Sequence, residues 1–258
     1  LTYKNNQEID DAVEQVIDQS KPHFEFTADD GVEHIIWRVP GGGDFQELFS
    51  ALRSAYVADG HHRSASAARV GAELRSKNKL HTGEEDYNWF LTVFFPDDQL
   101  SVLPYNRTVS DLNGYSDFEF IESVKSLVPL NQVDNGEPAG DGETRMFLSG
   151  RWYSLKWDQI GSDPVNSLDV SILQDRILDP VLGVKDPRTD DRIDFIGGIR
   201  GAEELVRRVE EGSAAVAFSM YPVDVSQLMS IADSGNIMPP KSTWFEPKLR
   251  SGLFIHTF

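Results

Sequence analysis

The chain is predicted to have a mixed α/β fold, because short apolar runs typical of strands alternate with stretches typical of helices. Residues 44–77 contain a helical stretch, an apolar run and a second helical stretch, and residues 192–233 contain two strand-like runs, each followed by a helical stretch. Such alternation is typical of proteins in which helices cover a sheet. With 258 residues, 40% of them hydrophobic, the chain is long enough to bury a substantial core.

In the first half of the chain, apolar spacing predicts the helices and continuous apolar runs predict the strands. Phe45, Leu48 and Phe49 fall on one helical face behind Asp44, which is an expected N-cap. The run Trp89–Phe95 is short enough for a buried strand, and the turn after it predicts a hairpin. In chain order, the expected elements are a helix at 7–18, a strand at 32–39, a helix at 44–54, a strand at 56–58, a helix at 61–77, and paired strands at 89–95 and 100–103.

In the second half, turn residues separate the predicted elements. Ser149 and Gly150 lie between two apolar runs and predict a hairpin, and Gly235 is an expected C-cap. The polar, turn-rich segment 131–143 predicts a flexible loop. The expected elements are a helix at 116–127, hairpin strands at 146–148 and 152–157, a helix at 168–178, a strand at 192–196, a helix at 202–211, a strand at 214–218, a helix at 225–233 and a strand at 253–257.

Charge and composition argue against several classes of function. The net charge is −18, and no cluster of five or more Lys and Arg interrupts the acidic sequence. A nucleic-acid partner is therefore disfavoured, because most of this surface repels a phosphate backbone. No apolar run approaches the ~18 residues of a membrane span, and the first residues show no secretory signal. The lack of cysteine excludes disulfides and thiolate metal sites and fits a cytoplasmic protein.

The segment YVADGHHRSASAAR at 56–69 is the strongest functional motif. Gly60 can adopt a backbone conformation closed to other residues, and a helix is predicted directly after it. The first turn of a helix has free N–H groups and a dipole that favour anions. His61, His62 and Arg63 add donors and positive charge at the same place. The motif therefore predicts a phosphate-binding turn, although it is not the Walker pattern.

Asp59 completes this motif, and it has two interpretations. It can orient one imidazole or hold Mg²⁺ through water; alternatively, the Asp-Gly pair only starts the helix, with Asp59 or Gly60 as its cap. The adjacent histidines alone cannot form a complete zinc site. Ala65, Ala68 and Ala72 form a small-residue face on the following helix, which predicts close packing on a sheet, although alanine also simply favours helix.

The second candidate is the loop PPKSTWFEPK at 239–248. Lys241, Ser242 and Thr243 offer a cation and two hydroxyl groups to phosphate oxygens, the prolines stiffen the loop, and the aromatic pair that follows can stack on a base. The alternative is a loop with a solvated lysine and buried aromatic residues.

Two weaker candidates are interpreted as structural. Arg107, within Asn106-Arg107-Thr108, is a lone arginine and is expected at the surface. The glycines near residue 197 lack the spacing of a dinucleotide fingerprint and indicate tight turns at a strand end.

Three segments resemble one known family. They are ADGHHRSASA at 58–67, DPRTDDRIDFIGGIRGAEEL at 186–205 and IMPPKSTWFEPKLRSGLFIH at 237–256. All three are similar to the family catalogued as the domain of unknown function 1015, and the resemblance covers most of the chain. The DGHHR element is also similar to that of the wider ParB/sulfiredoxin-like superfamily. The resemblance implies a ParB/sulfiredoxin-like nucleotide-binding core with a mixed sheet and flanking helices.

With this resemblance, the chain is predicted to divide into three parts. Residues 1–112 form a ParB-like core with the DGHHR phosphate turn. Residues 113–165 form a small α+β excursion with a flexible loop, and residues 166–258 form a C-terminal α/β part with the PPKSTWFEPK loop.

Some superfamily members with a DGHHR turn phosphorylate free L-serine with ADP or ATP, so the resemblance implies a small-molecule kinase. Gly60 and the amides after it would hold phosphate, and His61, His62 and Arg63 would stabilise the transferring group. Residues 241–243 would contact phosphate or the acceptor, and Mg²⁺ would arrive with the nucleotide. Family chains extend further N-terminally, which implies a general base outside these residues. Many relatives carry an aromatic residue where this chain has Ser64.

Three alternatives belong to other functional classes. The first is a regulatory module that binds a nucleotide without turnover. The second is a ParB-like DNA-binding protein or nuclease, which the net charge disfavours. The third is a structural or interaction protein. The sequence does not indicate the oligomeric state, the phosphoryl acceptor or a metal site.

Overall fold

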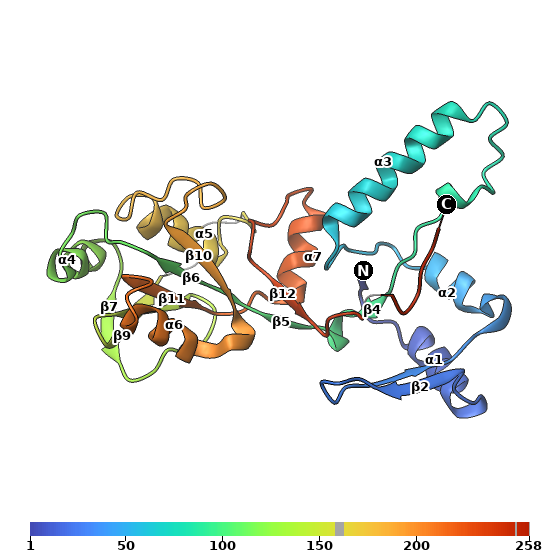
Figure 1. The fold of residues 1–258 in the computed structure, drawn as a ribbon, viewed down its shortest axis with the longest axis horizontal. Coiled ribbons are helices and arrows are strands. Elements are labelled where there is room, and N and C mark those ends of the chain that lie inside the picture. The colour runs from blue at the N-terminus through green and yellow to red at the C-terminus, as the bar shows by residue number, and fades with distance from the viewer. Residues whose placement is uncertain (158–162, 251, 258) are drawn as a thin grey trace. The chain divides into compact units, whose positions relative to one another are not determined.

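The computed structural model describes residues 1–157, 163–250 and 252–257, which form two compact units. The first unit comprises Leu1–Gln99 together with the residues from Arg250 onward, and the second comprises Leu100–Leu249. The boundaries predicted at residues 112 and 165 both lie inside the second unit, so the compact units divide the chain at other points. Helices and strands occur in both units, which confirms the mixed α/β class (Figure 1).

The first unit is built from short elements around a small buried set. Tyr3 and Ile9 are its largest buried apolar residues, and the Tyr3 ring packs edge-on against the Phe49 ring at 5.5 Å between centroids. The elements are β1 (Thr2–Tyr3) parallel to β4 (Phe95–Pro96), the hairpin β2 (Phe24–Thr27) and β3 (Glu33–Ile36), the helices α1 (Gln7–Gln19), α2 (Phe45–Ser50) and α3 (His61–Lys77), and the 3-10 turns η1 (Pro40–Gly42), η2 (Asp86–Asn88) and η3 (Asp97–Gln99).

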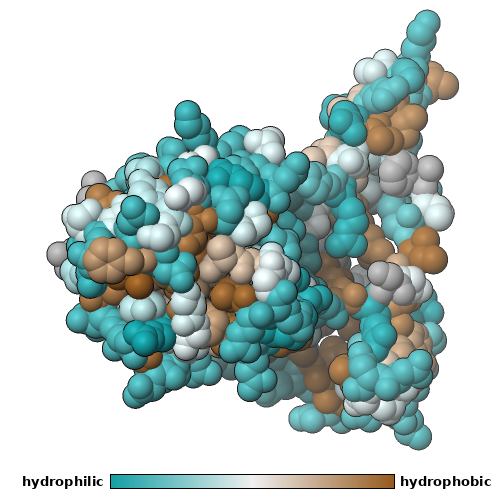
Figure 2. Space-filling model, turned by 60° about the vertical axis from the view of Figure 1, so that its left-hand side comes forward, coloured by the Kyte–Doolittle hydropathy of each residue, from teal (hydrophilic) through white to brown (hydrophobic). Residues whose placement is uncertain are grey.

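Four predictions for the first unit are wrong. The run Trp89–Phe95 is not a buried strand: only its last residue enters β4, and Trp89 is 59% exposed. Figure 2 shows that brown, hydrophobic residues occur at the surface of the protein. The expected strand at 56–58 is reduced to one bridge between Tyr56 and Thr2. Asp44 makes no side-chain capping bond, and its helix ends at Ser50. No strand forms in the described residues of 253–257.

The second unit contains a six-stranded antiparallel sheet with the order β10-β6-β11-β8-β9-β7. Successive side chains of a strand point to opposite faces of a sheet. In β11 (Val216–Met220), Val216 and Phe218 accordingly join the larger core, whereas Ala217 joins the smaller core beneath Leu205. The other strands are β6 (Tyr105–Val109), β7 (Leu130–Val133), β8 (Glu143–Leu148), β9 (Arg151–Lys156) and β10 (Ile193–Gly197).

The helices of the second unit follow the predicted pattern. A capping box between Ser116 and Glu119 starts α4 (Asp117–Leu127), and α7 (Val225–Asp233) ends before Gly235, which has a φ of 75°. The predicted helix at 168–178 consists of α5 (Asp169–Leu173) and the π-helical turn η4 (Gln174–Leu178). The remaining elements are the 3-10 turn η5 (Gly198–Arg200) and α6 (Gly201–Glu210). Among the described residues, no helix has the length and apolar character needed to cross a membrane.

Two predicted hairpins have opposite outcomes. The turn at Ser149 and Gly150, with φ angles of 47° and 75°, joins β8 to β9 as predicted. By contrast, β5 (Ser101–Leu103) pairs with β12 (Trp244–Glu246) and not with residues 89–95. The pairing with β12 places the PPKSTWFEPK loop next to a strand that is distant in the sequence.

Candidate functional site

The DGHHR turn has the backbone that its glycine predicts. Gly60 has φ 80° and ψ 27°, a left-handed conformation, and α3 begins at the next residue. The first hydrogen bond of the helix joins the Ser64 amide to the Gly60 carbonyl at 2.9 Å. The amides of residues 61–63 precede this bond, so they have no acceptor within the helix. The turn therefore presents helix N-terminal amides, a geometry that suits an anion.

Side chains place further donors at this turn. The Gly60 amide donates to Oδ1 of Asp59 at 2.7 Å. A Cβ atom built on Gly60 would lie 3.2 Å from Nη2 and 3.3 Å from Nε of Arg63, so the guanidinium folds back over the turn. His61, His62 and Arg63 are all exposed. A guanidinium next to helix N-terminal amides concentrates positive potential at one exposed place.

Helix α3 packs against the 3-10 turn η2 and not against a sheet. A Cβ atom on Gly71 would lie 2.7 Å from the Tyr87 carbonyl oxygen, so this face of the helix meets η2 at close range. Ala65 is exposed. The predicted packing of the alanine face on a sheet is therefore wrong. A groove of about 400 Å³ also runs beside the helix, from Ser64 to the aromatic residues Trp89 and Phe90.

Replacing Gly60 with alanine is expected to destabilise the first unit by about 1 kcal/mol and to disturb the Arg63 guanidinium. Gly31 is a matched control, because its φ is 81° and nothing lies within 4 Å of an added Cβ. Both variants carry the backbone strain, but only Gly60→Ala crowds Arg63. Urea unfolding and nucleotide titration measure the two effects. Equal nucleotide affinity in both variants would contradict the predicted phosphate-binding role of this turn.

Side chains of the PPKSTWFEPK loop contact other residues of the second unit. Lys241 has a φ of 55°, and its Nζ lies 5.1 Å from the centroid of the Tyr105 ring. Ser242 is buried, and its hydroxyl donates to the Pro239 carbonyl at 2.7 Å. Thr243 is half-buried. Lys241 therefore keeps an exposed ammonium group, whereas the Ser242 proton is engaged in shaping the loop.

The DGHHR turn belongs to the first unit and the loop to the second. Their convergence on one site stays a prediction. Among the described residues, no group of three or more His, Asp or Glu side chains is placed to hold a metal ion.

Arg107 is a residue that the sequence interpretation misplaced. It was expected at the surface, but only 4% of it is exposed, in the middle of β6. Its Nη1 donates to the Tyr105 carbonyl and its Nη2 to the Lys241 carbonyl at 3.2 Å. The guanidinium carbon lies 5.5 Å from the centroid of the Phe195 ring. Burial lowers the pKa of Arg107 to about 10, so the side chain stays charged at neutral pH. The context YNRTV favours a strand, but it does not indicate that the arginine is buried.

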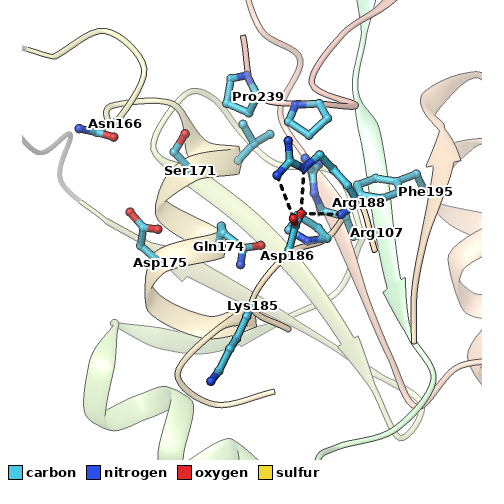
Figure 3. A pocket seen from close by; sticks show the side chains of 13 residues that line it. Arg107, Asn166, Ser171, Gln174, Asp175, Lys185, Asp186, Arg188, Phe195 and Pro239 are labelled. Carbon is cyan, nitrogen blue, oxygen red and sulfur yellow. Dashed lines mark hydrogen bonds and ion pairs between the residues drawn. The ribbon is translucent and has the colours of Figure 1, made fainter. Parts of the chain in front are cut away.

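Arg107 also lines a cavity of about 380 Å³ that lies within the second unit (Figure 3). Pro239 and Pro240 of the loop form part of its wall, together with Lys185 and the pair Asp186 and Arg188. Arg188 donates to the Asp186 carboxylate from its amide at 3.0 Å, from Nε at 2.9 Å and from Nη2 at 2.8 Å. Hydrogen bonds from Arg188 lower the pKa of Asp186 to about 2.

These features define a mixed α/β protein with a left-handed glycine turn at the start of a helix in one unit and a cavity lined by charged and apolar residues in the other. The chain belongs to the family described as a protein of unknown function, DUF1015, whose model matches residues 1–171. No curated protein matches the chain.

Solved structures with weak similarity include a conserved hypothetical protein from Pyrococcus furiosus, with a TM-score of 0.40, 14% identity, and coverage of 95% of this chain and 85% of that chain. A free serine kinase in complex with AMP has a TM-score of 0.38, 14% identity, and coverage of 95% and 81%. A variant of a free serine kinase in complex with ADP has a TM-score of 0.36 at 14% identity, with coverage of 95% and 82%. Membership of a ParB/sulfiredoxin-like superfamily stays a prediction.

Proposed function

We propose that this protein transfers a phosphoryl group from ATP or ADP to the hydroxyl group of free L-serine. The observation that carries the proposal is the Gly60 turn at the start of α3, with the Arg63 guanidinium folded over it. Phosphoryl transfer depends mostly on positioning and on neutralising charge on the transferring group. Helix N-terminal amides and a guanidinium supply both. The DGHHR resemblance supports the same reaction.

Each part of the motif has a separate role in this proposal. The backbone amides after Gly60 hold the phosphates, with Asp59 fixing the start of the turn. His61, His62 and Arg63 stabilise charge on the transferring phosphoryl group. Mg²⁺ enters with the nucleotide, because it is commonly bound through phosphates and a few carboxylates.

The loop at residues 241–243 contacts phosphate or the acceptor. Lys241 contributes an exposed ammonium group as a point charge. The Ser242 hydroxyl donates its proton to Pro239, so its lone pairs remain to accept a hydrogen bond from a substrate hydroxyl. Thr243 adds a second hydroxyl group.

The groove beside α3 suits the base of the nucleotide. It starts at Ser64, directly after the phosphate turn, and Trp89 and Phe90 line it. These two rings are 59% and 46% exposed. Stacking of a nucleobase on an aromatic side chain contributes about 1–3 kcal/mol to the binding free energy per base. We propose that adenine lies in this groove, where stacking compensates for the missing aromatic residue at Ser64.

Incubation of the full chain with L-serine, Mg²⁺ and either ATP or ADP tests the proposal. The expected result is phosphoserine, detected by mass spectrometry, with one nucleotide preferred. A rise in melting temperature with nucleotide but no product would instead support the non-catalytic nucleotide-binding module. Neither product nor stabilisation would contradict both functions.

A further inference from the structure

The cavity of the second unit contains a buried positive charge that no carboxylate offsets. The Arg107 guanidinium donates hydrogen bonds to two backbone carbonyls, those of Tyr105 and Lys241. Burial is the cause that lowers its pKa, and among the described residues no acidic side chain forms an ion pair with it. A guanidinium has more N–H donors than these two carbonyls use. A buried charge of this kind is costly unless a counter-charge reaches it.

The cavity wall adds positive charge around this group. Lys185 and Arg188 line the cavity with Arg107, against the two acids Asp175 and Asp186. This local excess of cations occurs in a chain with a net charge of −18. Three hydrogen bonds from Arg188 neutralise Asp186 (Figure 3). With Asp186 paired to Arg188, Arg107 remains as the buried cation of this wall, whereas Lys185 is exposed.

A second unmet bonding group lines the same cavity. The Gln174 amide nitrogen donates to the Val184 carbonyl at 2.7 Å, which fixes the orientation of the amide. Its Oε1 is buried and has no donor among the described residues. Phe195 and the prolines supply apolar wall, and the volume of about 380 Å³ is that of a small-molecule site. A ligand with an oxyanion and a neighbouring hydroxyl group or amine would satisfy both unmet groups.

We propose that this cavity binds a small organic oxyanion, a metabolite whose phosphate or carboxylate group pairs with Arg107. The site needs neither adenine nucleotide nor serine, so it goes beyond the proposed kinase function. The Arg188 guanidinium is already bonded to Asp186, so it contacts the ligand only where the ligand displaces that carboxylate.

Calorimetric titration of the full chain with inorganic phosphate and, separately, with acetate tests this site. We expect saturable binding at millimolar concentrations, and the tighter of the two probes identifies the oxyanion. Asp186→Asn removes a negative charge and releases Arg188, so it should tighten binding roughly threefold to tenfold. Gain of affinity is informative because misfolding cannot produce it. Arg188→Ala should weaken binding, because it removes a cation and leaves Asp186 uncompensated.

Two control variants assign the signal to this cavity. Arg151→Ala removes an exposed cation outside the cavity and should leave the affinity unchanged. His62→Ala changes the proposed phosphate turn, so any part of the signal that it weakens belongs to that turn and not to the cavity. The proposal is overturned if neither probe binds saturably, or if the affinity is insensitive to Asp186→Asn and Arg188→Ala. If His62→Ala abolishes phosphate binding, the anion binds at the DGHHR turn and not in the cavity. If the wild-type protein forms no phosphoserine but binds phosphate in the cavity, only the proposed kinase function is rejected.

Discussion

Replacing Arg63 with alanine is expected to lower kcat/KM for phosphoserine formation by at least ~100-fold, because arginines that stabilise transferring phosphoryl groups contribute factors of this size or larger. The guanidinium lies over the Gly60 turn, where the phosphates are proposed to bind. Arg63→Lys keeps the charge but loses the planar fork, so it should recover only part of the rate. Radiolabelled nucleotide assays under subsaturating serine measure the effect.

Arg69 provides the matched control for this substitution. It is an exposed arginine on the same helix, beyond the first turn. Arg69→Ala changes the net charge by the same amount as Arg63→Ala, but it removes no group from the proposed phosphate turn. Similar losses in the two variants would mean that general electrostatic attraction, not the turn, determines the rate. Unaltered activity in Arg63→Ala would remove the residue from the proposed mechanism.

Elements with local signals were predictable from the sequence. Helix α3 begins after Gly60, and α7 has the predicted bounds Val225–Asp233 with Gly235 beyond its end. The hairpin at Ser149 and Gly150 forms because both residues adopt positive φ angles. In each case the determining interaction joins residues a few positions apart, so a single sequence contains it.

Elements that depend on distant partners were not predictable in the same way. A continuous apolar run such as Trp89–Phe95 satisfies the pattern of a buried strand, but no strand in the described part of its unit pairs along its length. Its expected partner, β5, instead pairs with β12, more than a hundred residues later. Strand pairing is a tertiary property, and hydrophobic pattern alone cannot choose between such partners.

The same distinction applies to the candidate sites. The left-handed Gly60 and the helix start follow from local sequence, and the structure has both. The burial of Arg107 depends on Lys241, which is 134 positions away, and on Phe195 from the neighbouring strand. An arginine between Asn and Thr has no local feature that distinguishes a buried position from an exposed one. The cavity was therefore beyond sequence reasoning.

Asp169, at the start of α5, is a buried carboxylic acid with a raised pKa. Only 6% of the residue is exposed. The Trp157 indole donates to Oδ1 at 2.8 Å, and the Gly142 amide lies 3.1 and 3.2 Å from its two oxygens. The pKa of Asp169 is raised to about 6, mainly by burial. The hydrogen bond from Trp157 opposes this rise, and the negative charge of Asp141 contributes to it.

Because this pKa is higher in the folded state than in the unfolded chain, the folded protein binds the extra proton between about pH 4 and pH 6. Stability therefore falls as the pH rises through that window, and the shift corresponds to roughly 3 kcal/mol. Asp169→Asn cannot ionise and can still accept from Trp157. Urea titrations measure the free energy of unfolding of the variant and of wild type. The difference, variant minus wild type, should rise by this amount between pH 4 and pH 7, because only the wild type loses stability. Asp179→Asn is an exposed control of the same chemistry in the same unit. The same pH dependence in both variants would mean that the effect does not come from the buried carboxyl group of Asp169.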